Sequence, residues 1–422
     1  MRANLTPDVD LAARLFDALR EASFDGVGIT RDAYGPGEQR AHDLVRAEAA
    51  ALGLEIAIDP AGNMLMTLPG ADRTAKRIVL GSHLDSVPQG GNYDGAAGVL
   101  AGLATVAGLR QAGFVPGRDI TVLAIRAEEA GAWFPTSYPG SHAALGRLPP
   151  EVLEVKRMDT GRTLGQHMRD LGFDPAAVAR QKCLLPPASI AAYLELHIEQ
   201  GPVLDTEKIP VAVVTGIPGS RRLRAARVVG EYNHSGATPR RYRADAAIAL
   251  AELAHRLDEH WGGLEAQGHQ LVCTFCVLAT TAQAGFTKIP GEARFQLDVR
   301  SVLPASTDAM FAELHRLIAA IEPRRGVRFE LGPETGSLPS PMDAALRDGL
   351  VRAAQAGGIA YREMASGGGH DAAAFAQAGV PAAMLFVRNQ HGSHNPHEAM
   401  RMADFAASCA VMTRWAAAAA SS

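Results

Sequence analysis

Runs of apolar residues bounded by polar ones divide the chain into candidate strands and helices. Arg77–Leu80 (RIVL) and 120–125 (ITVLAI) are continuous apolar runs typical of buried strands, and the small apolar residues of 95–113 between them predict a helix. Upstream, a helical pattern fills 11–54, and 55–70 alternates as a hairpin does. Strand, helix and strand in this order predict a parallel α/β sheet.

The pattern changes after residue 210. Between 211 and 333 the runs read strand, helix, strand, strand, helix and strand, which predicts a compact inserted α+β domain of the split βαβ type. A helix and another apolar strand then resume the first pattern. We therefore predict a discontinuous first domain, 1–210 with 334–422, around an inserted domain, 211–333. The closing alanine tract is expected to fray.

Composition narrows the class of protein. The chain has 422 residues, 47% of them hydrophobic and 20% charged, as in a globular protein with a large core. The formal net charge is only -4 and no block rich in Lys and Arg occurs. Nucleic acid and membranes are therefore not expected as partners, and a small molecule is.

Nothing in the sequence predicts export or membrane insertion. We find no pattern of a secretory signal, no run of about 18 apolar residues that would span a bilayer, and no disulfide framework among the four cysteines. Cys273 and Cys276, spaced as CTFC in an apolar run, are expected to be packing residues. We expect a cytoplasmic location.

Polar residues gather where the predicted strands end. His83 and Asp85 follow the first strand and, two residues apart, point the same way if the strand geometry persists. Asp94 stands at the start of the next helix, and Glu128 and Glu129 end the second strand, where neighbours face opposite ways. Because ligands of such sheets bind outside the carboxyl ends of the strands, these side chains mark a candidate site.

His197 and His394 add imidazoles to this set of carboxylates. Mixed nitrogen and oxygen ligands suit zinc, manganese, cobalt or nickel, and an aspartate that bridges two such ions is a hydrolytic arrangement. A further glutamate that binds no metal can accept a proton from water. These residues therefore predict a metal-dependent hydrolase.

Ordered motifs along nearly the whole chain resemble those of one enzyme family. They read GSHLDSVPQGGNYDGAAGVL, AEE followed by AWF, ELHIEQGPVL, GEYNHSGATP, IPGEARFQLDVR, SGGGHDA and GSHNPHEAM. The chain thereby resembles the hydantoinase/carbamoylase family of amidohydrolases, which includes N-carbamoyl-L-amino-acid hydrolases, β-ureidopropionases and allantoate amidohydrolases. That family belongs to the clan of di-metal aminoacylases and carboxypeptidases. The resemblance implies a hydrolase of non-peptide C–N bonds.

The same resemblance implies two divalent metal ions per subunit, zinc or else manganese, cobalt or nickel. His83 and His197 would bind the first ion, Glu129 and His394 the second, and Asp94 would bridge both. These ligands would lie on a mixed, mostly parallel sheet flanked by helices. The inserted domain would be a lid, and the chain would form a homodimer through it.

Catalytic roles also follow from the resemblance. Glu128 would be the general base and Asp85 would orient His83, while His234 would reach the active site of the partner subunit and stabilise an oxyanion. Arg300 would bind the substrate carboxylate as a planar bidentate donor. The other implied substrate-binding residues are Gln200, Thr287, Gly367, Gly368, Gly369 and His370.

The chain departs from the family's pattern in three places. Thr287 stands where many members have Asn before IPG, so a hydroxyl replaces a carboxamide that helps to hold substrate. Trp133 stands in the region of an arginine that usually follows the glutamate pair. The stretch before the last histidine adds Arg388, Asn389 and His391 near the pocket. These differences leave the side chain of the substrate open.

The predicted reaction is cleavage of the ureido C–N bond of an N-carbamoyl-L-amino acid or a similar ureido acid. The products would be the free amino acid, ammonia and carbon dioxide. Two alternatives stay open: a hydrolase of N-acyl amino acids or dipeptides with the same metals, and a non-catalytic metal- or amino-acid-binding protein on this fold.

Overall fold

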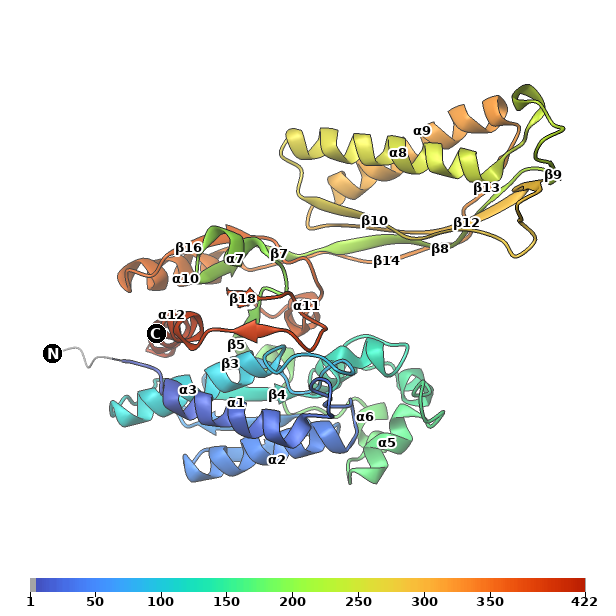
Figure 1. Cartoon of the computed structure of the whole chain (residues 1–422). Helices are drawn as coiled ribbons and strands as arrows, with labels where there is room; N and C mark the ends of the chain where they lie inside the picture. Colours follow the sequence, from blue (N-terminus) through green and yellow to red (C-terminus); the bar gives the residue numbers. More distant parts are fainter. Residues whose placement is uncertain (1–4, 422) are drawn as a thin grey trace. The chain divides into compact units, whose positions relative to one another are not determined.

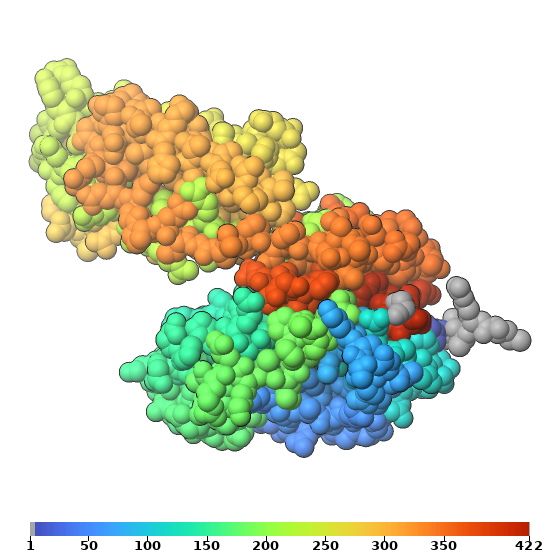
Figure 2. All heavy atoms as spheres, turned by 180° about the vertical axis from the view of Figure 1, so that it is seen from behind, coloured from blue at the N-terminus to red at the C-terminus, as the bar shows by residue number. Residues whose placement is uncertain are grey.

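The chain folds into two compact units. In this computed structural model, which describes residues 5–421, one unit takes the residues up to Thr215 and again from Met342 (Figure 1). The other is the continuous run Gly216–Pro341, coloured yellow-green to orange in Figure 2. The first unit is therefore discontinuous in sequence, and the second is an insertion.

The two boundaries differ from the predicted ones at 210/211 and 333/334. Strand β6 (Val211–Val214) pairs inside the sheet of the first unit, whereas β14 (Glu334–Ser337) pairs inside the inserted unit. Each strand therefore belongs to the unit on the other side of the predicted cut. Their pairing partners are distant in sequence, which local pattern alone does not reveal.

One mixed sheet of eight strands forms the centre of the first unit. In spatial order the strands are β1 (Glu55–Ile58), β2 (Met64–Leu68), β4 (Ile120–Ile125), β3 (Arg77–His83), β5 (Ile190–Ile198), β17 (Ala382–Val387), β6 and β16 (Tyr361–Met364). The neighbours β4, β3, β5 and β17 run parallel to one another. All six residues of β4 are buried, as expected for a strand covered on both faces.

Helices surround this sheet and bury its faces. The longer ones are α1 (Val9–Ser23), α2 (Pro36–Ala51), α3 (Ala96–Gln111), α10 (Ala344–Ala356) and α12 (Met402–Ala420). Short ones are α4 (Pro139–Ala144), α5 (Leu164–Asp170), α6 (Pro175–Ala179), α7 (Val203–Glu207) and α11 (Asp371–Gln377). Helix α3 is buried on all sides from Ala96 to Leu109, where glycine and alanine let strands and helices approach closely.

The alanine-rich end of the chain does not fray, contrary to the prediction. Helix α12 continues to Ala420, and Ala416, Ala417 and Ala420 are buried in the core of the first unit. The carbonyl oxygen of Ala420 accepts a hydrogen bond of 2.7 Å from the amide of Gly117. The small alanine side chains allow α12 to pack closely, so the alanine-rich composition of this segment reflects tight packing of the helix.

The inserted unit has the predicted order of strands and helices. Its elements are β8 (Gly219–Val229), α8 (Ala246–Ala266), β10 (Leu271–Thr280), β12 (Glu292–Ser301), α9 (Pro304–Arg325) and β13 (Arg328–Glu330), followed by β14. The strands form an antiparallel sheet in the order β10-β12-β8-β13, and β14 also pairs with β8. Helices α8 and α9 lie over one face of this sheet (Figure 1) and bury a separate apolar core.

Short two-residue strands complete the description. They are β7 (Gly216–Ile217), β9 (Asn233–His234), β11 (Lys288–Ile289), β15 (Ser340–Pro341), β18 (Asn389–Gln390) and β19 (Ala399–Met400). None of the helices within residues 5–421 combines the length and the apolar character needed to cross a membrane.

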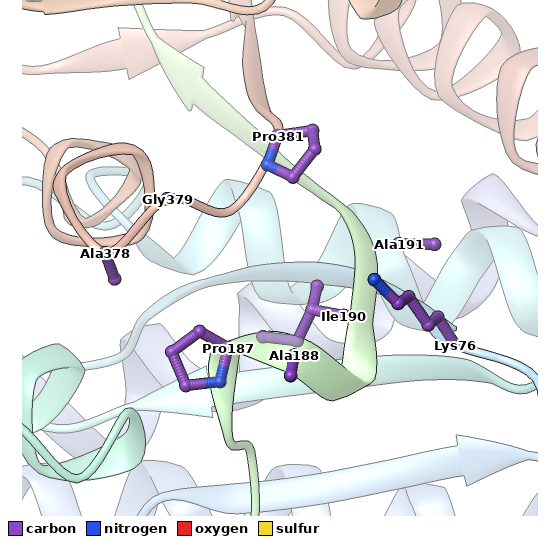
Figure 3. Close-up of a pocket in the computed structure, with 8 residues that line it drawn as sticks. All are labelled: Lys76, Pro187, Ala188, Ile190, Ala191, Ala378, Gly379 and Pro381. Carbon is purple, nitrogen blue, oxygen red and sulfur yellow. The ribbon is translucent and has the colours of Figure 1, made fainter.

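The two ends of the central sheet differ in character. At the amino ends of β3, β5 and β17 a hollow of about 490 Å³ is lined mainly by alanine, proline and isoleucine, with the single charged side chain of Lys76 (Figure 3). The predicted site residues of the first unit instead follow the carboxyl ends of the same strands. A chemical site is therefore expected at that end, as in other open α/β sheets.

Candidate active site

The strands of the first unit deliver four site residues to the same edge of the sheet. His83 is the last residue of β3, and His197 is the penultimate residue of β5. His394 lies in the loop that follows β17 and β18, and Asp94 precedes α3. Residues that are 311 positions apart in the numbering, His83 and His394, thus reach one cluster.

The glutamate pair is not on a strand, which corrects the prediction. β4 ends at Ile125, and Glu128 and Glu129 begin a 3₁₀ turn that ends at Ala132. Ala127 before them adopts a left-handed backbone conformation with φ of 56°, which is costly for a residue other than glycine. This turn, and not the alternation of a strand, sets the directions of the two carboxylates.

Three buried side chains form an inner group: His83, Asp94 and His197. Oδ1 of Asp94 is 3.5 Å from Nε2 of His83 and 3.2 Å from Nε2 of His197, and the two Nε2 atoms are 3.4 Å apart. The Nδ1 atoms face only acceptors, the backbone oxygens of Asp85 at 3.1 Å and Ile198 at 2.9 Å. In the neutral imidazoles Nδ1 therefore carries the hydrogen, and both Nε2 lone pairs point into the group.

Asp94 is shared with an outer group that also contains Glu129 and His394. Nε2 of His394 is 2.8 Å from Oε1 of Glu129 and 3.5 Å from Oδ2 of Asp94. The His394 side chain is 49% exposed, whereas those of the inner histidines are 1% exposed. One carboxylate thus connects a buried group with a solvent-accessible one.

The donor atoms of both groups suit divalent cations. Within each group one ligand atom from every residue lies within 4.8 Å of the others, so either group can hold a metal ion. Oδ1 of Asp94 is buried and has no hydrogen-bond partner among the described residues. A buried carboxylate oxygen that faces two imidazole nitrogens is costly unless a proton on the rings or a metal cation lies between them. Nitrogen and carboxylate ligands fit zinc, manganese, cobalt or nickel.

Asp85 lies behind this arrangement and holds two parts of it. The fully buried carboxylate accepts the amide hydrogens of Glu128 at 3.1 Å and Glu129 at 3.0 Å. Its Oδ1 is also 3.2 Å from Nδ1 of His83. The contact with His83 fits the predicted orienting role, and the contacts with the turn add an anchor for the glutamate pair.

Glu128 faces the inner group from this turn. Its Oε2 lies 3.8 Å from Nε2 of His83, and its side chain is 8% exposed. Burial raises the pKa of the Glu128 carboxyl well above its ordinary value, since the charge of His83 offsets only part of the desolvation. A carboxyl in this position can exchange protons with a water molecule beside the metal ligands.

The glycine-rich loop 367–369 packs beside the cluster. A β-carbon on Gly368 would lie 3.1 Å from Oε1 of Gln200, and one on Gly369 would lie 1.8 Å from the hydroxyl of Tyr138. Gln200 itself donates from Nε2 to Oδ2 of Asp94 at 2.8 Å. Only glycine permits this approach of the loop at 369.

His370 follows that loop and is buried. Its Nε2 is 2.9 Å from Oγ of Ser366, and its ring centroid is 4.5 Å from that of His197. Burial lowers the pKa of His370 well below its ordinary value, which favours the neutral ring. His370 and the preceding glycines are thus adjacent to the inner group.

The remaining predicted residues belong to the inserted unit. His234 on β9 is exposed, and its Nδ1 accepts the amide hydrogens of Gly236 at 3.1 Å and Ala237 at 3.0 Å. The amide of Ser235 donates to the carbonyl of Thr287 at 2.9 Å, so His234 and Thr287 lie on one ribbon. Arg300 on β12 donates from Nη2 to Oδ2 of Asp298 at 2.8 Å.

The sequence and the fold are similar to those of known proteins. Residues 79–418 match the family described as peptidase family M20/M25/M40. The chain is 34% identical to an N-carbamoyl-L-amino acid amidohydrolase of Geobacillus stearothermophilus, with 88% of each chain covered. It is 32% identical to an allantoate amidohydrolase of Bacillus subtilis, with 89% of each covered. A crystal structure of a hydantoinase/carbamoylase family amidase from Burkholderia ambifaria is 31% identical, covers 99% of this chain and 98% of that one, and superposes with a TM-score of 0.86.

The chain belongs to the M20/M25/M40 family, in its hydantoinase/carbamoylase branch. The resemblance drawn from the motifs is thereby confirmed, as is the fold class of a mixed, mostly parallel sheet flanked by helices. This amidase is a hydrolase that acts on non-peptide C–N bonds.

Two of this amidase's departures from its family's pattern are structural. Trp133 is 8% exposed, donates from Nε1 to the carbonyl of Ser86 at 2.9 Å and packs against the guanidinium of Arg157. Arg388 forms two hydrogen bonds of 2.8 Å with the carboxylate of Asp404. The side chains are therefore engaged in packing and in a buried ion pair, although their neighbours in sequence approach the site.

Further residues contact the inner and outer groups of this amidase and were not predicted. Arg31 is fully buried and donates to the carbonyl of Leu84 at 2.6 Å, while Ser393 and Glu398 contact Asp94 or its backbone. Each is a single polar residue outside a strand end. The only signal available was that Ser393 and Glu398 share the motif GSHNPHEAM with His394.

Proposed function

We propose that this amidase hydrolyses the ureido C–N bond of an N-carbamoyl-L-amino acid or a similar ureido acid, with two divalent metal ions bound. The observation that carries the proposal is the position of Asp94. Its two oxygens face the inner and the outer group, and the inner one has no other partner among the described residues. The relatives named for N-carbamoyl-L-amino acids and for allantoate support a ureido substrate.

His83 and His197 would hold one ion, Glu129 and His394 the other, and Asp94 both. Ions bound there supply Lewis acidity, which lowers the pKa of water and polarises a carbonyl group. Asp85 would keep His83 and the glutamate turn in place through the contacts described above. Nearby cations favour the ionised form of Glu128, which makes this carboxylate a base.

Glu128 would transfer one proton in each turnover. It would take the proton from the attacking water and deliver it to the leaving nitrogen, while the oxygen of that water forms a bond to the ureido carbon. Cleavage releases the free amino acid and carbamate, and carbamate decomposes to ammonia and carbon dioxide. Water supplies all the added atoms, so no further reactant is needed.

His234 would stabilise the negative charge that develops on the ureido oxygen. Since its Nδ1 accepts two amide hydrogens, the hydrogen of the neutral ring is on Nε2, which is a suitable donor on an exposed ribbon. Arg300 would bind the substrate carboxylate, with Asp298 holding its guanidinium. Gln200, Thr287, the glycines 367–369 and His370 would complete the pocket.

We further infer a homodimer formed through the inserted unit, with His234 serving the partner's site. Strand β10 is at the edge of its sheet and exposes Val272 by 43%, Val277 by 40% and Leu278 by 51%. An exposed apolar edge strand is prone to pair with another chain. Leu278→Lys should therefore yield monomers in sedimentation experiments and lose activity, and a fully active monomer would contradict the shared site.

Substrate identity is tested with one panel. The metal-loaded enzyme is assayed for ammonia release from N-carbamoyl amino acids, β-ureidopropionate and allantoate, and for acid release from N-acetyl amino acids and dipeptides. Ammonia release at least 100-fold faster than acid release is expected. Preference for N-acetyl substrates would overturn the ureido assignment. Metal binding without any turnover would indicate a non-catalytic binding protein.

A further inference from the structure

Glu398 contacts both loops that carry the candidate metal ligands. Its side chain is buried, and Oε1 accepts the amide hydrogens of Tyr93 at 2.9 Å and Asp94 at 3.2 Å. Its Oε2 lies 2.5 Å from Oγ of Ser393, the residue before His394. One carboxylate therefore connects the Asp94 loop with the His394 loop, which are about 300 residues apart in sequence.

Ser393 continues this connection to the carboxylate of Asp94. Its Oγ is 2.6 Å from Oδ2 of Asp94, which also accepts from Gln200. Oδ2 thus has two hydrogen-bond partners, whereas Oδ1 has none among the described residues and faces the two inner imidazoles. These contacts fix the rotation of the carboxylate, so that one oxygen points to each group.

The surrounding chain is built around the Glu398 side chain. A β-carbon on Gly91 would lie 2.1 Å from Cδ of Glu398, so the loop before Asp94 passes directly over it. The buried guanidinium of Arg31 donates to the side chain of Asn92 at 3.2 Å and to the backbone oxygen of Asp94 at 3.4 Å. The Asp94 loop is therefore held from its backbone amides and from its carbonyls at the same time.

From this geometry, and resting on the proposed di-metal function, we propose that Glu398 is a positioning residue. Through Ser393 and the amide of Asp94, it holds the Asp94 carboxylate in the orientation that bridges two ions. Glu398 itself need not bind a metal.

The number of hydrogens in this network separates two possible roles of Glu398, that of its hydrogen-bond geometry and that of its negative charge. A serine hydroxyl has one hydrogen, so both Ser393 contacts are hydrogen bonds only when the carboxyl of Glu398 carries a hydrogen and donates it to Ser393 while Ser393 donates to Asp94. A glutamine at 398 could accept the two loop amides with its oxygen and donate its amide hydrogen to Ser393. Ser393 would then remain free to donate to Asp94. A positioning role is therefore retained by glutamine and lost with alanine.

The test measures metal affinity on the full-length enzyme stripped of metal, by titration with Co²⁺ against a chromophoric chelator and by the visible spectrum of bound Co²⁺. We expect Glu398→Ala to weaken binding of at least one of the two ions by 10-fold or more and to change the Co²⁺ spectrum. Glu398→Gln should stay within 3-fold of wild type, and Ser393→Ala should fall between the two. Excess Co²⁺ should restore part of the turnover of Glu398→Ala.

Asp59→Ala is the matched control. Asp59 is also a buried carboxylate that accepts two loop amides, those of Ala61 at 2.8 Å and Asn63 at 2.9 Å, but within residues 5–421 it makes no direct hydrogen bond to a residue of the inner or the outer group. The affinity of the Asp59→Ala variant for Co²⁺ should equal that of wild type, even if the variant melts at a lower temperature. Equal affinity of Glu398→Ala and wild type, or equal losses in Glu398→Ala and Glu398→Gln, would overturn the positioning role. A wild-type enzyme that binds fewer than two ions would instead overturn the proposed function.

Discussion

Asp85→Asn tests how the glutamate turn is held in place. The buried carboxylate accepts one amide hydrogen on each oxygen, from Glu128 and from Glu129, and Oδ1 also faces Nδ1 of His83. Asparagine has the same shape but only one acceptor oxygen. In the variant, one of the two amide hydrogens of the turn therefore faces an NH₂ group and has to move away.

The size of the effect follows from these contacts. A hydrogen bond to a charged group contributes about 1.5–3 kcal/mol, and a buried donor left without a partner costs about 1–3 kcal/mol. We expect Asp85→Asn to lower the free energy of unfolding by about 2–4 kcal/mol. If about half of this loss falls on the position of Glu128 in the transition state, kcat decreases about 5- to 30-fold.

Unfolding in urea and kcat from ammonia release measure the two quantities on the same preparation, and elemental analysis reports the bound metal. Asp59→Asn is the control, because it alters a buried carboxylate that holds a different loop and reaches the glutamate turn only indirectly, through Asn63 and the amide of Arg126, and it should leave kcat within about twofold. The reasoning is refuted if Asp85→Asn retains the wild-type kcat with a full complement of metal. In that case the turn would be held by its own packing.

Three further outcomes are expected. Glu128→Gln should lower kcat about 100- to 10,000-fold, the usual contribution of a general base, with both metals retained in elemental analysis; near-normal turnover would exclude Glu128 as the base. Arg388→Ala should lower the free energy of unfolding by about 3–5 kcal/mol, because it leaves Asp404 as a buried unpaired charge, with KM almost unchanged. A raised KM at normal stability would place Arg388 in the pocket instead. Burial raises the pKa of Asp59 from 3.8 to about 6, so the folded state binds the proton more tightly and the contribution of Asp59 to the stability of the wild-type protein falls as pH rises from 4 to 7. Asp59→Asn lacks this titration, so from pH 4 to pH 7 the free energy of unfolding of the variant should rise by about 2 kcal/mol relative to that of wild type, and parallel pH profiles would contradict the shift.

Continuous apolar runs and the residues at their ends made much of this protein predictable. Strands β3 and β4, which lead to His83 and to the glutamate pair, are covered on both faces, so their sequences are apolar over most of their length. The inserted unit is antiparallel, and its order of elements is likewise visible in the sequence, although its strand β8 pairs with strands that are distant along the chain. The family motifs supplied the roles that pattern alone does not assign.

Side-chain direction and long-range pairing were less predictable. The turn at Glu128 follows a left-handed alanine, and its typical turn residue, Gly131, comes only after the glutamate pair, so the pair was taken for a strand end. Trp133 and Arg388 stand near site residues in sequence. In the structure Trp133 is a packing residue that donates to the carbonyl of Ser86, and Arg388 forms an ion pair with Asp404. Glu398 acts on residues about 300 positions away, and no local pattern marks such a contact.

The place of β17 in the central sheet has a consequence for biosynthesis. This strand pairs with β5 on one side and β6 on the other, although it begins at Ala382 and β5 ends at Ile198. At synthesis rates of about 5–20 residues per second, β5 and β6 wait roughly 10 to 40 s for their shared neighbour to leave the ribosome. The inserted unit, by contrast, is complete once Pro341 has emerged. Nascent chains should therefore acquire a protease-resistant insertion first, while the edges of the unfinished sheet stay open to chaperones or to aggregation.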